Sequence, residues 1–106
     1  MTIYLLNAPI ITSYGRYLYR PCDVSEARAL LANSAYVSAV GHEATAQIMS
    51  ALLGYPVPVN RIAVRMEKGD VAVVFRILTR LPEGKILTVE ELKNTPFEIG
   101  FLTREE

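Results

Sequence analysis

The stretch VGHEATAQIMSALLG, residues 40–54, contains the only histidine of the chain, at a point where a buried strand is predicted to lead into a helix. Apolar residues recur there at the spacing that gives a helix one apolar face: Ile48, Ala51 and Leu52. Gly54 stands where a left-handed residue commonly ends a helix. We therefore expect His42 to be held at a helix N-terminus.

A histidine in that position suits a bound anion. The first backbone N–H groups of a helix have no partner within it, so an anion can dock on them, and a phosphate would also use an imidazole proton. The ordinary alternative is a helix-end histidine that bonds to backbone or water. Glu43 also has an ordinary explanation, because an acidic residue in the first turn stabilises the helix dipole.

Length and composition limit the class of protein. At 106 residues the chain has the length of one domain, and its 51% content of hydrophobic residues favours self-association. Basic and acidic residues number 11 each, so no bulk charge draws the chain to duplex DNA or to an anionic membrane. The single cysteine excludes a disulfide within the chain, and one cysteine with one histidine argues against a zinc site.

The N-terminal residues predict a first strand rather than a signal peptide. They lack a basic segment, and Asn7 and Pro9 interrupt their apolar run. No apolar stretch approaches the length that spans a membrane. These features predict a soluble protein in a reducing, cytoplasmic setting.

Strand and helix patterns alternate along the chain, which predicts a single α/β domain with a mixed sheet of about five to six strands and about three helices. Before the central helix we expect strands over residues 2–6, 14–22 and 35–40, the second of them at a sheet edge. A helix is expected over residues 24–32, capped by Asp23 or Ser25.

After the central helix, residues 61–67 alternate so that Ile62, Val64 and Met66 share one face. Lys68-Gly69 is a two-residue hairpin signal, which predicts antiparallel pairing of this strand with a strand over residues 71–80. A last helix is expected after Thr88, with Glu91 at the capping-box position, followed by a strand over residues 96–102.

Four side chains are candidates for chemistry: His42, Arg61, Arg80 and Glu83. Judged singly, each of the last three has an ordinary role. Arg61 would be a solvated strand arginine, Arg80 a strand-end residue that reaches water, and Glu83 a turn acid. The residue pattern alone does not combine them into one site.

Four strings do combine them, because they occur in order and at similar spacing across nearly the whole chain. They are Leu5-Leu6-Asn7-Ala8, Gly41-His42-Glu43-Ala44-Thr45, Asn60-Arg61-Ile62 and Arg80-Leu81-Pro82-Glu83-Gly84-Lys85-Ile86-Leu87-Thr88. Together they resemble the viral anti-CRISPR ring nuclease family, which has relatives in bacterial genomes and plasmids.

The resemblance implies a homodimeric α/β protein that binds cyclic tetra-adenylate, the second messenger of type III CRISPR defence, and cuts it without a metal or other cofactor. The catalytic residues that it implies are His42, Arg80 and Glu83. The implied substrate-binding residues are Asn7, Ala8, Thr45, Asn60 and Arg61. The family usually has an aromatic residue and a serine after Asn-Ala, where this chain has Pro9 and Ile10, so that serine's role in positioning the substrate backbone is not carried over.

The implied chemistry matches what RNA cleavage needs. The ribose 2′-OH is the nucleophile, so in-line attack on the adjacent phosphorus needs positioning, charge neutralisation and a proton for the 5′-oxygen. His42 would supply that proton as general acid, because an imidazole is partly protonated near neutral pH. Arg80 would stabilise the phosphorane, Glu83 would orient Arg80 or a ribose hydroxyl, and Arg61 would grip phosphate or adenine in the ground state.

One histidine per chain suits a two-fold dimer around a two-fold-symmetric ring. Two cuts would then release linear diadenylates with 2′,3′-cyclic phosphate ends. Two other classes stay open. A dimeric binding module would sequester a cyclic oligonucleotide or dock a protein, with His42 only as a hydrogen-bond donor. A nucleic-acid-binding regulator is disfavoured by zero net charge and by the lack of a basic recognition helix.

Overall fold

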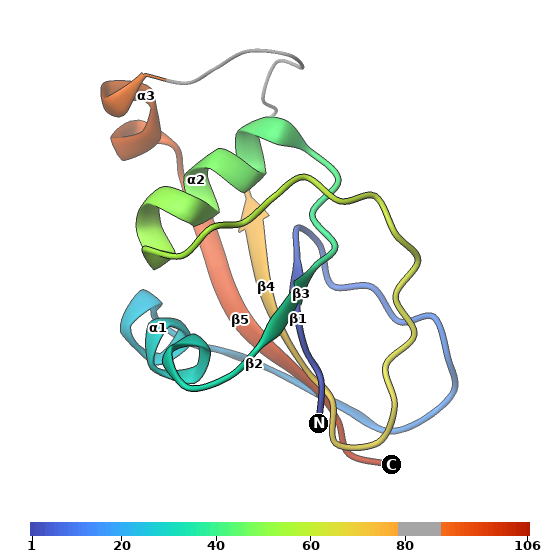
Figure 1. The fold of residues 1–106 in the computed structure, drawn as a ribbon. Helices are drawn as coiled ribbons and strands as arrows, with labels where there is room; N and C mark the ends of the chain where they lie inside the picture. Colours follow the sequence, from blue (N-terminus) through green and yellow to red (C-terminus); the bar gives the residue numbers. More distant parts are fainter. Residues whose placement is uncertain (79–87) are drawn as a thin grey trace.

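A computed structural model describes residues 1–78 and 88–106 of the chain. These residues form five strands and three helices, in the order β1 (Ile3–Leu6), β2 (Tyr17–Pro21), α1 (Val24–Ala32), β3 (Tyr36–Ser38), α2 (Glu43–Leu53), β4 (Val71–Ile77), α3 (Val89–Asn94) and β5 (Phe97–Arg104). Figure 1 shows helices α1 and α2 on one side of the sheet and the two termini at the same end of the molecule.

The strands form one mixed sheet in the order β2-β5-β4-β1-β3. Strands β3 and β4 flank β1 and run parallel to it, while β5 is antiparallel to both β4 and β2. Helix α2 connects β3 to β4 and therefore crosses over β1, as in a βαβ unit. The expected single α/β domain with a mixed sheet is confirmed, with five strands among the described residues.

The larger core lies between the sheet and helices α1 and α2. Its fully buried members come from both layers, and include Leu5, Ala27, Ile48, Met49 and Phe75. Each helix turns an apolar stripe toward the strands, because 3.6 residues per turn bring such positions to one face. This packing holds the first turn of α2 above the sheet.

Helix boundaries agree closely with expectation because local capping sets them. Asp23 caps α1 with a capping box, in which its side chain accepts from the backbone N–H of Glu26 at 2.7 Å. Thr88 forms the predicted capping box with Glu91 at the start of α3. Gly54, with φ of 75°, ends α2 in the left-handed conformation.

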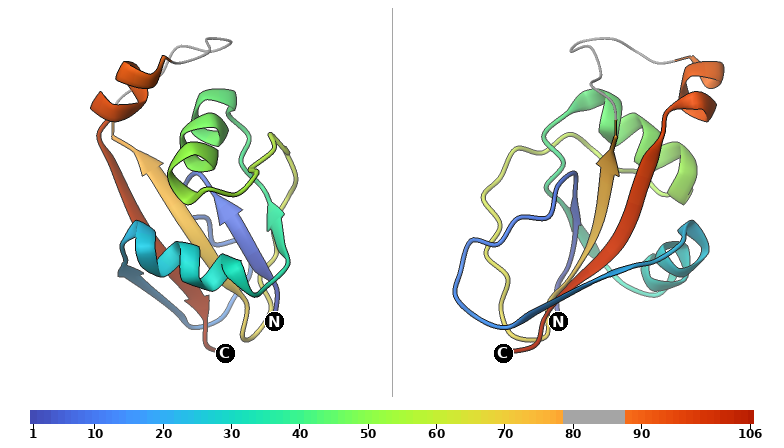
Figure 2. Two further views of the ribbon diagram at one scale, coloured as in Figure 1. Left: turned by 60° about the vertical axis from the view of Figure 1, so that its left-hand side comes forward. Right: turned by 180° about the vertical axis from the view of Figure 1, so that it is seen from behind.

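Two long segments cover the other face of the sheet, on the side opposite α1 and α2 (Figure 2). One connects β1 to β2, and the other connects α2 to β4. The second segment starts on the helix side with Val57, passes the edge strand β3, and brings Val64 and Met66 onto the opposite face. Together with residues of β1, β4 and β5 they form a smaller second core.

The predicted hairpin between residues 61–67 and β4 is wrong. Residues 61–67 form no strand, and both edges of β4 are occupied, one by β1 and the other by β5. The turn at Lys68-Gly69 does form, with φ of 88° at Gly69, but it returns the chain beside β5, where Gly69 N–H donates to Arg104 O at 2.8 Å. The predicted alternation still holds for Val64 and Met66, which are buried, while Arg65 between them is exposed.

Strand boundaries are shorter than expected at the sheet edges. The edge strand β2 covers residues 17–21 rather than 14–22, and β3 covers 36–38 rather than 35–40. An edge strand has a partner on one side only, so its ends leave the ladder early. The segment that follows β4 contains Arg80 and Glu83, which lie outside the described residues.

Candidate functional site

The candidate site lies at the end of the sheet where the carboxyl ends of the parallel strands β1 and β3 meet. Asn7 and Ala8 follow β1, and the segment that leads to His42 follows β3. The two strand ends are joined by a bond from Ala39 N–H to Leu5 O at 2.9 Å. In open α/β sheets, ligands commonly bind beyond the carboxyl ends of parallel strands. The fold therefore brings Asn7, Ala8 and His42 to the edge where a ligand site is expected.

His42 is the N-cap residue of α2, as the sequence predicts, with extended backbone and no capping bond from its side chain. Its carbonyl accepts from Ala46 N–H at 3.0 Å, which is the first hydrogen bond of the helix. The N–H groups of Glu43, Ala44 and Thr45 precede that bond and have no carbonyl acceptor within the helix. The first turn of this 11-residue helix thus presents donors that suit an anion.

The imidazole of His42 has an unusual surrounding. Its Nδ1 atom is buried, and no group among the described residues forms a hydrogen bond with it. Buried polar atoms in proteins nearly always have a partner, so an unpaired ring nitrogen needs an explanation. A ligand, or a residue outside the described parts of the chain, would complete it.

Asn60 and Arg61 hold the segment that leads to His42. The side-chain amide of Asn60 donates to Ser38 O at 2.8 Å, and Asn60 N–H donates to Val40 O at 2.8 Å. Arg61 Nε–H donates to Gly41 O at 2.9 Å. A Cβ on Gly41 would lie 3.1 Å from Arg61 Cγ, so a larger residue there would push the arginine away. These two residues therefore position the backbone next to His42.

Ser38 is a further residue of this clamp that the sequence did not indicate. It is 5% exposed, its hydroxyl donates to Pro58 O at 2.6 Å, and it accepts from Val40 N–H at 3.4 Å. Proline has no N–H, so Pro58 cannot extend the sheet as a strand partner would. The serine hydroxyl supplies the contact instead. A lone serine at a strand end carries no signal that could have revealed this role.

The remaining predicted site residues have different positions. Thr45 lies in the first turn of α2 and is only 5% exposed, so it is largely withdrawn from solvent. Asn7 and Ala8 are partly buried. The structure thus brings the segment of Asn60 and Arg61 beside the residues that lead to His42, at the N-terminus of the helix that contains Thr45. Arg80 and Glu83 are outside the described residues.

Three further observations concern other chemistry. Burial raises the pKa of the Cys22 thiol to about 11, with Glu26 adding to the effect, so the thiol is a poor nucleophile near neutral pH. Within residues 1–78 and 88–106, no three metal-ligating side chains gather in one place. In the same parts of the chain, every helix is too short or too polar to cross a bilayer.

The arrangement is suited to bind a phosphate. The first N–H groups of a helix, an imidazole and an arginine held next to it supply donors and positive charge. Among the described residues, no acidic side chain forms an ion pair with Arg61. An imidazole at such a site can also transfer a proton.

The chain is similar in sequence to viral proteins and to a bacterial protein. The chain is 36% identical over 110 residues to uncharacterized protein ORF117 of Acidianus two-tailed virus, covering 98% of this chain and 94% of the viral protein. It is 42% identical over 102 residues to uncharacterized protein 26 of a Sulfolobus islandicus filamentous virus, covering 92% and 86%. It is also 33% identical over 106 residues to uncharacterized protein YddF of Bacillus subtilis, covering 98% of both chains.

The same fold occurs in a solved structure, protein B116 of Sulfolobus turreted icosahedral virus. The two structures superpose with a TM-score of 0.79 over 98% of this chain and 100% of B116, at 23% sequence identity. At that identity the likeness concerns the fold. The family model of the STIV B116-like proteins matches residues 3–99, so the chain belongs to the STIV B116-like family.

Proposed function

We propose that this protein is a metal-independent ring nuclease, which cleaves cyclic tetra-adenylate to linear diadenylate with 2′,3′-cyclic phosphate ends. The observation that carries the proposal is the position of His42, at the open N-terminus of α2 with Nδ1 buried and unpaired among the described groups. The viral relatives add support, because a virus benefits from removing a defence signal. The choice of cyclic tetra-adenylate as substrate comes from the resemblance of the sequence strings to the ring nuclease family.

The chemistry needs only groups that the RNA and the chain contain. The ribose 2′-OH attacks the adjacent phosphorus and loses its proton to solvent, while the bond from phosphorus to the 5′-oxygen breaks. His42 donates a proton to that oxygen, and the N–H groups of the first turn of α2 hold a phosphate oxygen. Each cut thus leaves a cyclic phosphate and a free 5′-hydroxyl.

Other residues would position the substrate and stabilise charge. Arg80 would neutralise the phosphorane, and Glu83 would orient Arg80 or a ribose hydroxyl. In the sequence, Arg80 comes two residues after Leu78, and Leu78 directly follows β4. Strand β4 runs parallel to β1. Asn7, Ala8 and Thr45 would contact the cyclic nucleotide. Asn60 and Arg61 would hold the turn before His42 and bind the phosphate at which His42 acts.

A homodimer is part of the proposal, because each chain carries a single histidine and the ring has two-fold symmetry. Each copy would cut one of two opposite phosphates. The partners would then be cyclic tetra-adenylate and a second copy of the chain, with no role for duplex DNA or a membrane.

The test incubates wild type, His42→Ala and Arg28→Ala with cyclic tetra-adenylate in EDTA, and resolves the products by chromatography and mass. Arg28 is an exposed residue of α1 that lies near Gly54, at the other end of α2 from His42. We expect linear diadenylate from wild type and Arg28→Ala, and a loss of at least about 100-fold in His42→Ala. Circular dichroism checks that His42→Ala is folded.

Three results would contradict the proposed catalysis. An intact ring in all samples, combined with tight binding of the ring, would favour a module that sequesters the nucleotide and uses His42 only as a donor. Product in both wild type and His42→Ala would mean that another residue is the general acid. A rate that depends on added divalent cation would contradict the metal-independent mechanism.

A further inference from the structure

The segment between α2 and β4 runs beside the outer edge of strand β3. Among the described strands, β3 pairs only with β1, so the backbone groups on its other side need partners from elsewhere. Two residues of the passing segment, Pro56 and Pro58, have no N–H group to donate to a sheet ladder. Side-chain hydroxyls of β3 make the contact instead.

Two hydroxyls of β3 hold the two proline carbonyls at matching positions. The Tyr36 hydroxyl donates to Pro56 O at 2.7 Å, and the Ser38 hydroxyl donates to Pro58 O at 2.6 Å. Side chains two residues apart in a strand lie on the same face, and the two acceptors are also two residues apart. The bonds therefore align the two stretches in the same direction with an offset of 20 residues. We call this pair of bonds the hydroxyl ladder.

The same offset continues to the candidate site. Asn60 N–H donates to Val40 O and Arg61 Nε–H donates to Gly41 O, so both contacts again join residues 20 positions apart. Successive contacts with one offset define a register, as between two parallel strands, although the passing segment forms no strand. The register decides which residue of the segment lies beside the turn that precedes His42.

Ser38 supports this register with two further contacts. Its backbone carbonyl accepts from the side-chain amide of Asn60 at 2.8 Å, and its hydroxyl accepts from Val40 N–H at 3.4 Å. Val40 is fully buried, and a buried N–H group that loses its acceptor is unfavourable. We therefore expect loss of the Ser38 hydroxyl to disturb the register more than loss of the Tyr36 hydroxyl.

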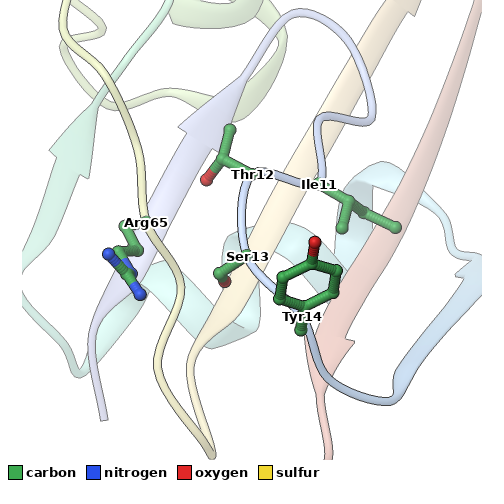
Figure 3. Close-up of a pocket in the computed structure, with 5 residues that line it drawn as sticks. All are labelled: Ile11, Thr12, Ser13, Tyr14 and Arg65. Carbon is green, nitrogen blue, oxygen red and sulfur yellow. The ribbon is translucent and has the colours of Figure 1, made fainter.

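The passing segment is also anchored outside the ladder, on both sides of it. On one side, Val57 N–H donates to the Ser50 hydroxyl of α2 at 2.9 Å. On the other side, the hydroxyls of Thr12 and Ser13 donate to backbone carbonyls that flank Arg65 (Figure 3). Loss of the ladder should therefore change the stretch between these anchors and leave the rest of the fold in place.

We propose that Tyr36 and Ser38 are positioning residues, which set the register that places Arg61 beside the turn before His42. The inference rests on the proposed function, in which Arg61 binds the phosphate at which His42 acts. A slip of the segment by two residues would move the arginine by about 6.6 Å, farther than a hydrogen bond reaches. In this role the two hydroxyls act through the segment and need no contact with substrate.

Hydrogen exchange of single backbone amides tests the register without any assay of activity. We expect the Asn60 amide to exchange at least about tenfold faster in Ser38→Ala than in wild type, and faster still in the double variant Tyr36→Phe/Ser38→Ala. The Val57 amide is anchored outside the ladder and should keep its rate. This internal control separates a local loss of register from a lower stability of the whole protein.

Tyr55→Phe is the matched control for Tyr36→Phe. The two tyrosine rings pack edge to face, with centroids 6.5 Å apart. Within residues 1–78 and 88–106, the Tyr55 hydroxyl forms no hydrogen bond, whereas the Tyr36 hydroxyl holds Pro56 O. The control thus removes the same atom from the same aromatic pair without breaking the ladder, and the Asn60 amide should keep its wild-type rate.

The nuclease assay tests what the register does for the site. Displacement of Arg61 weakens binding of the substrate, so KM for cyclic tetra-adenylate should rise at least about tenfold in the double variant. A defect that only lowers the folded fraction would reduce kcat and leave KM unchanged. The rise in KM is therefore the result that separates positioning from general stability.

The failures of the two proposals are distinguishable. Wild-type protein that leaves cyclic tetra-adenylate intact would overturn the proposed function, while amide exchange would still test the register. An Asn60 amide that keeps its wild-type rate in the double variant would overturn the role of Tyr36 and Ser38. Faster exchange of Asn60 with an unchanged KM would overturn the link from the register to Arg61 and the substrate.

Discussion

The two sides of the sheet bury apolar surface in different ways. On the helix side, α1 and α2 satisfy their own backbone hydrogen bonds and can devote one face to the core, which includes Leu5, Ile48 and Phe75. On the other side, two irregular segments have to recruit hydroxyls and the Arg104 guanidinium to hold their carbonyls. Their core is smaller, and they leave Ile11 and Tyr14 in solvent. The comparison indicates that the helix side stabilises the monomer and the loop side is available for contacts.

The largest expected effect on the free energy of unfolding comes from a substitution on the helix side. Phe75 is fully buried and stacks on Phe97, with ring centroids 4.6 Å apart and an interplanar angle of 17°. Phe75→Ala removes the ring and leaves a cavity, so it should lower the free energy of unfolding by about 3–5 kcal/mol. Urea unfolding at one fixed protein concentration measures this. A loss below about 1 kcal/mol would mean that the helix-side core does not dominate stability.

An intermediate effect on the free energy of unfolding is expected at Asp70, where the chain turns back into the sheet. The buried Asp70 carboxylate accepts from Thr2 N–H at 2.8 Å and from Glu67 N–H at 2.8 Å. Asp70→Asn turns one acceptor into a donor that faces an N–H group, and should cost about 1–3 kcal/mol.

The control for Asp70→Asn is Glu98→Gln, the same chemical change at a carboxylate that pairs with Arg76 at 2.9 Å on the exposed surface. A surface ion pair contributes little, so this variant should lose less than about 1 kcal/mol. Equal losses in the two variants would contradict a special role of the buried carboxylate.

The smallest effect on folding is expected on the loop side. Ile11→Ser changes a side chain that is mostly in solvent, so the free energy of unfolding of the isolated monomer should change by no more than about 0.5 kcal/mol. Urea unfolding at low protein concentration measures this change. A large loss of monomer stability would show that Ile11 belongs to the core.

Local patterns predicted the helices well. The Asp23 cap, which was one of two candidates, the Thr88 cap, the apolar stripe of α2 and Gly54 all involve residues within a few positions of one another. Such local relations can be recognised in the sequence without knowledge of the rest of the fold. The predicted hairpin failed for the opposite reason. The alternation of Val64 and Met66 indicated which side is buried, but it could not indicate that β1 and β5 would occupy both edges of β4.

The same division applies to the candidate site. Its histidine was predicted from neighbours in sequence, since Gly41 precedes it and an apolar helix follows. The clamp around it joins positions about twenty residues apart, as in the bond from Asn60 to Ser38. The ring nuclease activity and the roles of Arg80 and Glu83 stay predictions that the nuclease assay tests.

The sequence by itself determined the helices, their caps, the α/β class and the place of His42 at a helix N-terminus, because 3.6-residue periodicity and capping act over short distances along the chain. Only the tertiary structure decided the strand order, the unpaired burial of His42 Nδ1 and the exposure of Ile11 and Tyr14. These features depend on which distant segments compete for the same sheet edge or the same face, and that competition is resolved only when the whole chain packs.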